Sequence, residues 1–167
     1  MIEAEADALE IEVTAPCPTW QEACPEAVTL AREAARLALR RGAAPFAAVV
    51  DITLADDATQ RALNRTWRGK DAPTNVLAFP AADPSVPLPE GAPLLLGDVV
   101  LAFETVRREA SGQDKRFEDH LRHLIVHGVL HLIGHDHEDA ADAAAMEAQE
   151  IAILAELGVP NPYCDTM

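Results

Sequence analysis

The residues best able to do chemistry lie between His123 and His137, in the stretch HLIVHGVLHLIGHDH. His127 and His131 are four residues apart on a predicted helix, so both imidazoles project from one face with about 6 Å between their Cβ atoms. Gly134 lets the chain turn, and the turn can bring His137 to the same point. Three imidazoles that leave a fourth position for water describe a catalytic site for one zinc ion per chain, because structural zinc sites are usually closed by four ligands.

The offsets of these histidines equal those of the HExxHxxGxxH motif of metzincin proteases, but glycine stands at position 128. In the proteases a glutamate at that place takes a proton from the activated water, which Gly128 cannot do. The general base is therefore elsewhere, or the substrate supplies it, or the reaction is not peptide hydrolysis. Met146 lies in an alanine-rich helical segment without a turn signal, so we expect it to pack in the core rather than to form a methionine turn.

Arg68 and Asp98 are two further candidates outside the histidine stretch. Arg68 follows a predicted helix beside Gly69 and Lys70, where its planar guanidinium could bind a phosphate. By residue type alone, an exposed arginine is more often only solvated. Asp98 interrupts the apolar run LLLGDVVLA, so we expect it to cap, to be paired or to be functional, because burying an unpaired carboxylate is expensive.

Other polar residues near the three histidines could support the site or pack in the core. His123 shares a helix face with His127 and could hydrogen-bond a neighbour of the metal, although a packed core histidine is the favoured interpretation. His120 and His135 are expected on the solvent side. Asp136 could orient an imidazole through its second ring nitrogen.

Composition and length indicate one globular domain covering residues 1–167, with 49% hydrophobic and 25% charged residues. The acidic start MIEAEADALEIEV is unlike an export signal, and no apolar run reaches the length of a membrane span, so we expect a cytoplasmic protein without membrane contact. Cys17, Cys24 and Cys164 have no metal-binding or redox spacing and are expected to be reduced thiols.

The formal net charge of −15 argues against nucleic-acid binding by the surface as a whole, because Lys and Arg supply most non-specific affinity for phosphates. The charges are unevenly distributed, however. Nine of the 13 basic residues lie between positions 61 and 122. The sequence is therefore compatible with a local basic surface on an otherwise acidic protein.

Hydrophobic periodicity predicts an α+β fold: a small mixed four-stranded sheet packed with about five helices, with the zinc site at a helix end and the following turn. A proline-rich surface loop is expected at 80–93. We expect strands at 9–14, 46–54, 75–79 and 94–102, and helices at 25–41, 56–67, 103–112, 118–134 and 138–157.

Three separated motifs, RGKDAPTNVLAFP, LGDVVLA and HGVLHLIGHDH, occur in the order found in the YbeY family of metal-dependent endoribonucleases, which act in ribosomal RNA maturation, and the chain resembles that family from about Leu63 to its last helix. The resemblance implies that His127, His131 and His137 bind zinc and that Arg68 is the functional arginine of the cleft. Two positions depart from the family pattern: His135 stands where tyrosine is more frequent, and Ala78 where serine is.

The function expected from this resemblance is a zinc-dependent, single-strand-specific endoribonuclease for small-subunit ribosomal RNA maturation and ribosome quality control. Its partners would be single-stranded ribosomal RNA, the small ribosomal subunit and assembly factors, and not DNA. Two alternatives stay open. One is a metzincin-like metallopeptidase, and the other is a metal-stabilised ribosome-assembly factor without catalysis of its own, in which protein atoms would saturate the metal.

Overall fold

A computed structural model describes residues 9–42, 47–81, 94–134 and 140–163. Within these residues the chain forms four strands and six helices, so the predicted α+β class and four-stranded mixed sheet are confirmed. The elements, in chain order, are β1 (Glu10–Thr14), α2 (Thr19–Ala23), α3 (Ala27–Arg41), β2 (Ala48–Ala55), α4 (Asp57–Arg68), β3 (Val76–Pro80), β4 (Leu94–Ala102), α5 (Phe103–Gly112), α6 (Phe117–Leu132) and α7 (Ala140–Glu156).

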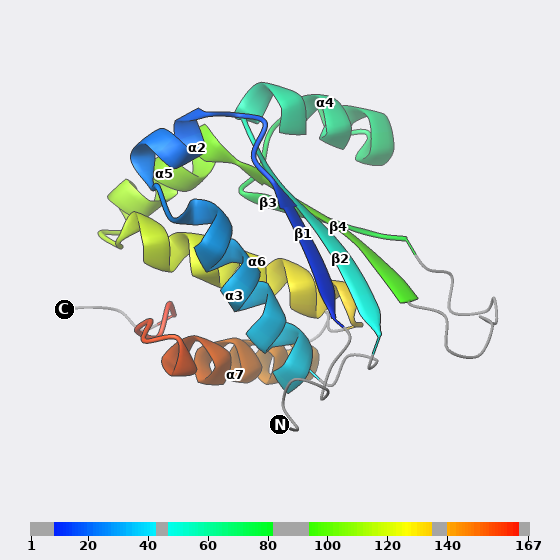
Figure 1. Cartoon of the computed structure of the whole chain (residues 1–167), viewed down its shortest axis with the longest axis vertical. Coiled ribbons are helices and arrows are strands. Elements are labelled where there is room, and N and C mark those ends of the chain that lie inside the picture. The colour runs from blue at the N-terminus through cyan, green and yellow to red at the C-terminus, as the bar shows by residue number, and fades with distance from the viewer. Residues whose placement is uncertain (1–8, 43–46, 82–93, 135–139, 164–167) are drawn as a thin grey trace.

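The sheet has the order β1-β2-β4-β3. β1, β2 and β4 run parallel, and β3 pairs antiparallel with β4 at one edge. β1 lies at the other edge, where the alternation of acidic and apolar residues in Glu10–Thr14 suits a strand with one face toward solvent. In Figure 1, α3, α6 and α7 lie together on one side of the sheet, and α4 lies across the sheet from them. The edge strand β3 therefore has one face toward α6 and the other toward α4.

Helix α4 begins and ends where its sequence predicts. The side chain of Asp56 accepts a hydrogen bond of 2.8 Å from the backbone N–H of Thr59, which is a standard N-cap. Gly69 ends the helix with a positive φ of 73°, a conformation that glycine adopts at low cost. The end of α4 is thereby fixed at Arg68, the residue for which a phosphate contact is expected.

Two buried polar side chains of α4 hold the loop that leads into β3. Nε2 of Gln60 donates to the carbonyl of Val100 on β4 at 3.0 Å, and Oε1 of Gln60 accepts from the backbone N–H of Thr74 at 2.7 Å. Nδ2 of Asn64 donates to the carbonyl of Ala72 at 2.7 Å. The bonds to Thr74 and Ala72 satisfy backbone groups that lie outside the strands, and so they fix the path from Arg68 to β3.

The expectation for His120 is wrong, whereas the expectation that Asp98 is a cap, a paired group or a functional group stays a prediction. Asp98 is exposed, because it lies on the sheet face away from α6, directly beside Asp51 of β2. Partial desolvation and the neighbouring Asp51 raise its pKa. His120 was expected at the surface, but it is 3% exposed and its Nε2 lies 2.9 Å from Oε1 of Glu109. The short helix α2 was not predicted either.

The structure also describes the environments of Met146 and of two of the three cysteines. Met146 is buried and packs in the core, as expected. Cys17 and Cys24 are free thiols, and Cys164 lies outside the described residues. Among the helices described, none combines the length and apolarity that crossing a bilayer requires. Most of the predicted loop at 80–93 also lies outside the described residues, and the single domain covering 1–167 stays a prediction.

Candidate functional site

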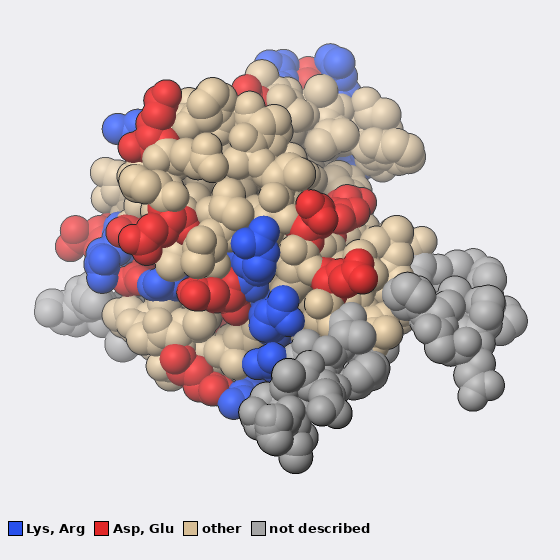
Figure 2. Space-filling view, in the orientation of Figure 1, with Lys and Arg blue, Asp and Glu red and all other residues tan. Residues whose placement is uncertain are grey.

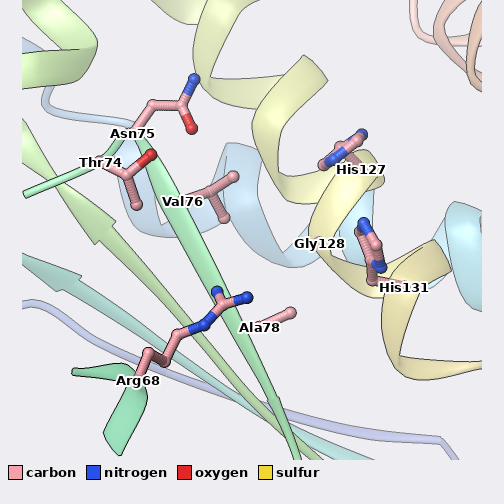
Figure 3. A pocket seen from close by; sticks show the side chains of 8 residues that line it. All are labelled: Arg68, Thr74, Asn75, Val76, Ala78, His127, Gly128 and His131. Carbon is pink, nitrogen blue, oxygen red and sulfur yellow. The ribbon is translucent and has the colours of Figure 1, made fainter. Parts of the chain in front are cut away.

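A pocket of about 320 Å³ opens between β3 and α6. Figure 3 shows β3 residues on one wall and two histidines of α6 on the other, with the Arg68 side chain extending over β3 toward them. Three of the four residues singled out from sequence are thus brought together. The lining residues are Arg68, Thr74, Asn75, Val76, Ala78, His127, Gly128 and His131.

His127 and His131 are successive-turn neighbours on α6, and their ring centroids are 5.0 Å apart. Both side chains are partly buried and both line the pocket. The opposite flank of α6 packs into the core through apolar residues such as Ile125 and Val129. The helix is therefore held firmly while its histidine face stays accessible, as the i, i+4 spacing predicted.

Gly128 lets α6 approach the sheet closely. A Cβ atom placed on Gly128 would lie 2.9 Å from Cγ1 of Val99 and 3.3 Å from Cγ2 of Val76. The first of these distances is too short for real carbon atoms, so even alanine would force the Val99 side chain or the helix to shift. A glutamate, the residue that metzincins carry at this place, has no space here. The structure thus gives a packing reason for the glycine that the sequence alone could not.

Glu150 of α7 lies behind the histidine face and is fully buried. Its Oε2 lies 2.6 Å from Nδ1 of His127, and its Oε1 lies 3.1 Å from Nε2 of His123. The hydroxyl of Tyr163 donates a further hydrogen bond to Oε1. A carboxylate that accepts from Nδ1 fixes the tautomer and the orientation of the imidazole, and leaves Nε2 as the nitrogen for metal coordination.

The hydrogen bonds keep Glu150 ionised in spite of its burial. Burial alone would raise the pKa, but the bonds from His123, His127 and Tyr163 outweigh it and lower the pKa to about 2. Burial and the same carboxylate raise the pKa of the Tyr163 phenol. At neutral pH the group behind His127 is therefore an anion, which strengthens the imidazole as a donor to a cation.

Sequence reasoning missed Glu150, although a signal was present. Its neighbours on the helix, Met146, Ile153 and Leu154, are all buried, and they stand four residues before, three after and four after it. An acid in the middle of an apolar helix face must be paired. The alanine-rich composition drew attention to helix propensity instead. His123, favoured as a packed core histidine, is mostly buried and bonded to this same carboxylate.

Asn75 is held in the pocket from a different direction. Its Nδ2 donates to Oε1 of Glu109 on α5 at 2.9 Å, and the same oxygen lies 2.9 Å from Nε2 of the buried His120. Because these bonds use the amide nitrogen, the amide oxygen is the part of the side chain left to face the pocket, as Figure 3 shows. The pocket therefore offers a neutral acceptor beside the cationic guanidinium of Arg68.

The donor set of the pocket fits a borderline-soft divalent ion, because it combines two imidazoles one turn apart with a buried carboxylate that orients one of them. Within residues 9–42, 47–81, 94–134 and 140–163, no three His, Cys, Asp or Glu side chains are grouped so as to hold a metal ion. The third expected ligand, His137, lies outside those residues, as do His135 and Asp136. The expected three-histidine set stays a prediction.

Basic side chains gather over α4 and along α3 in Figure 2, whereas acidic ones flank β1. Helix α4 carries Arg61, Arg65 and Arg68. Arg61 forms a two-pronged ion pair with Asp71, at 2.8 and 3.1 Å. Of the three arginines of α4, one is therefore paired with a carboxylate and another, Arg68, lines the pocket.

Comparisons with known proteins agree with these features. A family profile described as "Endoribonuclease YbeY" matches residues 17–158. A protein from Paramagnetospirillum magneticum named endoribonuclease YbeY is 54% identical over 157 residues, which cover 93% of this chain and 96% of that protein. One of the same name from Rhodopseudomonas palustris is 51% identical over 160 residues, covering 95% and 91%.

A solution structure of a Thermotoga maritima protein has the same fold, with a TM-score of 0.58, 23% sequence identity and coverage of 89% of this chain and 88% of that one. At this identity the likeness concerns the fold alone. The match to the family profile and the relatives of about 50% identity go further, since both extend over the pocket residues from Arg68 to His131. This chain belongs to the endoribonuclease YbeY family.

Proposed function

We propose that the chain is a zinc-dependent endoribonuclease that cuts single-stranded RNA in the cytoplasm, in small-subunit ribosomal RNA maturation and ribosome quality control. The observation that carries the proposal is one pocket that holds Arg68 opposite His127 and His131. Membership of an endoribonuclease family supplies the RNA substrate, and the ribosomal role rests on that membership alone.

His127, His131 and His137 are proposed to hold one zinc ion. Zinc, when bound, supplies Lewis acidity that activates water and polarises a phosphoryl oxygen. Glu150 contributes by accepting a hydrogen bond from Nδ1 of His127, which orients the ring so that Nε2 is the nitrogen available to the metal.

Arg68 is proposed to bind the scissile phosphate and to stabilise the charge that develops on it. A guanidinium presents several N–H donors in a planar fork that matches two phosphate oxygens, and it stays protonated throughout. Such a group acts most strongly where charge increases during the reaction. The amide oxygen of Asn75, on the same pocket wall, can accept a hydrogen bond from a ribose hydroxyl and so help to place the backbone.

An extended single strand fits this site better than a duplex, because the narrow pocket can admit one backbone whose bases are splayed apart. The peptidase alternative loses support on packing grounds, since the close contact of Gly128 with Val99 leaves no space for the glutamate base. Cleavage of a generic peptide library above the level of a His131→Ala variant would restore that alternative.

The proposal is tested by replacing Arg68 with alanine and with lysine. Both variants should keep one equivalent of zinc, while the alanine variant loses cleavage of a single-stranded RNA by about 100-fold or more, as expected for loss of a donor to developing charge. Arg65→Ala is the matched control, because Arg65 lies in the same last turn of α4 but does not line the pocket. Unchanged cleavage by Arg68→Ala would reject the role of the arginine.

The remaining alternative is an assembly factor whose metal is closed off by protein atoms. Replacing zinc with cobalt distinguishes the two, because an open coordination position responds to added anions with a changed visible spectrum and a saturated one does not. We expect a response. Precursor ribosomal RNA that accumulates when the chain is depleted, and is matured by wild type but not by Arg68→Ala, would support the ribosomal role.

A further inference from the structure

A second hollow, of about 520 Å³, lies beside the pocket and carries the most exposed aromatic side chain among the described residues. We call it the Trp67 groove. Trp67 is 71% exposed and lies beside other apolar side chains of the groove, and contiguous exposed apolar surface often marks an interaction site. The lining residues of the groove are Thr53, Leu63, Trp67, Phe79, Pro80, Ala81, Asp98 and Val100.

The groove and the pocket are separated only by the edge strand β3. Ala78 lines the pocket and the next residue, Phe79, lines the groove, because successive side chains of a strand point to opposite faces. At the end of α4 the same division recurs, with Trp67 in the groove and Arg68 in the pocket. A chain that crosses the end of β3 therefore meets the guanidinium and the indole in immediate succession.

The chemistry of the groove suits a flat, uncharged group rather than a phosphate. Its apolar lining comes from Trp67, Phe79 and Leu63, and no Lys or Arg lies among its lining residues as described. Its charged member is Asp98, which accepts hydrogen bonds and repels phosphate. Unpaired bases stack on aromatic side chains, and a carboxylate can accept from an exocyclic amino group on a base edge.

We propose that the Trp67 groove is a base-binding subsite, in which a nucleotide adjacent to the scissile phosphate stacks its base on Trp67 and presents its edge to Asp98. This inference rests on the proposed function, because the occupant is the single-stranded RNA whose phosphate Arg68 binds. The strand crosses β3 with the phosphate on the Arg68 side and the base on the Trp67 side. Adenine, guanine and cytosine, which carry an exocyclic amino group, bind there better than uracil.

The first test compares the affinity of variants for a short single-stranded oligonucleotide with 2′-O-methyl riboses, which binds without being cut. Trp67→Ala should weaken binding by about fivefold or more, the effect expected from losing one stacked base. Trp67→Phe should restore most of the affinity, because it keeps an aromatic face. Leu95→Ala is the matched control, since Leu95 is also an exposed apolar residue, 44% exposed, but does not line the groove.

The second test uses tryptophan fluorescence. The chain has two tryptophans, and Trp20 is fully buried, so acrylamide quenches mainly Trp67. A bound oligonucleotide should protect Trp67 from acrylamide, whereas an oligomer of the same length and charge without bases should not. Asp98→Asn should reduce the preference for cytosine over uracil at the position next to the cleaved bond and leave the melting temperature unchanged.

Wild-type cleavage of RNA keeps the two hypotheses distinct. If wild type cuts RNA and Trp67→Ala binds the oligonucleotide as tightly as Leu95→Ala does, the base subsite is rejected and the groove is left to a protein partner. Oligonucleotide binding that leaves Trp67 open to acrylamide would reject it as well. Binding and cleavage of RNA by wild type are measured first. If wild type neither binds nor cuts RNA, the proposed function itself is rejected.

Discussion

The carboxylate of Glu150 on α7 lies 2.6 Å from Nδ1 of His127 on α6. This contact joins two helices through a group that the pocket itself does not expose, because Glu150 is fully buried. It makes the last helix part of the proposed metal site, even though none of the pocket-lining residues comes from α7.

Glu150→Gln should weaken zinc binding by about 10- to 100-fold, because an amide can present its NH₂ group to Nδ1 and then no longer fixes the ring. The measurement is competition for zinc with a chromophoric chelator. Glu147→Gln is the control, since Glu147 is exposed on the same helix. Equal zinc affinity of the two variants would contradict the role given to Glu150.

His137→Ala and His135→Ala test which histidine beyond Gly134 is the third ligand. We expect the first variant to lose stoichiometric zinc and the second to keep it, because the spacing after the helix favours position 137. Metal content after dialysis measures both. If the His135 variant is the one that loses zinc, the proposed ligand set is wrong. His135 would then be the third ligand, which would explain why this chain has histidine where tyrosine is more frequent in the family.

Gly128→Ala should lower the free energy of unfolding by about 1–3 kcal/mol, because its Cβ would lie 2.9 Å from Cγ1 of Val99. The gain in helix propensity of about 1 kcal/mol offsets only part of this cost. Adding Val99→Ala should relieve the clash, so the two substitutions should be coupled by about 0.5–3 kcal/mol. Denaturant titrations of the two single variants and the double variant give this coupling. Strictly additive changes in the free energy of unfolding would show that there is no steric clash between residue 128 and Val99.

His120 gives the protein a pH dependence near neutrality. Burial lowers its pKa below 6.5, against the opposing effect of Glu109. The folded state therefore binds the proton less readily than the unfolded state does, so the stabilisation is complete above about pH 6.5 and is lost as the pH falls from there toward the folded pKa. Between pH 8 and pH 5, the melting temperature of His120→Gln should decrease less with falling pH than that of wild type. A chelator is kept in all samples, so that metal release does not contribute to the difference, and parallel curves would contradict the assignment.

The sequence predicted the elements well because their signals are local. Asp56 and Gly69 set the two ends of α4 through capping chemistry that needs no distant partner. The four-residue spacing placed His127 and His131 on one face. For Arg68, periodicity gave only its position after a helix, and the resemblance to a family supplied the expectation of a role.

The errors have a common physical origin in tertiary contacts. Asp98 looked buried because its neighbours in sequence are apolar, yet strand alternation turns it away from α6 to the other face of the sheet, where it is exposed. His120 looked exposed, but α5 brings Glu109 against it. The apolar helix face around Glu150 indicates that this acid is paired, but its partners, His123 and His127, lie 27 and 23 residues away along the chain. No local pattern contains such pairs.

Because α7 packs behind α6, the histidine face can be completed only after α7 has been synthesised. During synthesis the chain emerges from its N-terminus, so Arg68, His127 and His131 leave the ribosome before Glu150 does. A nascent chain that ends before α7 lacks Glu150, which is hydrogen-bonded to Nδ1 of His127, and lacks the part of the core that α7 supplies. The order of the histidine face therefore depends on α7, a segment that is synthesised after the helix that carries the histidines.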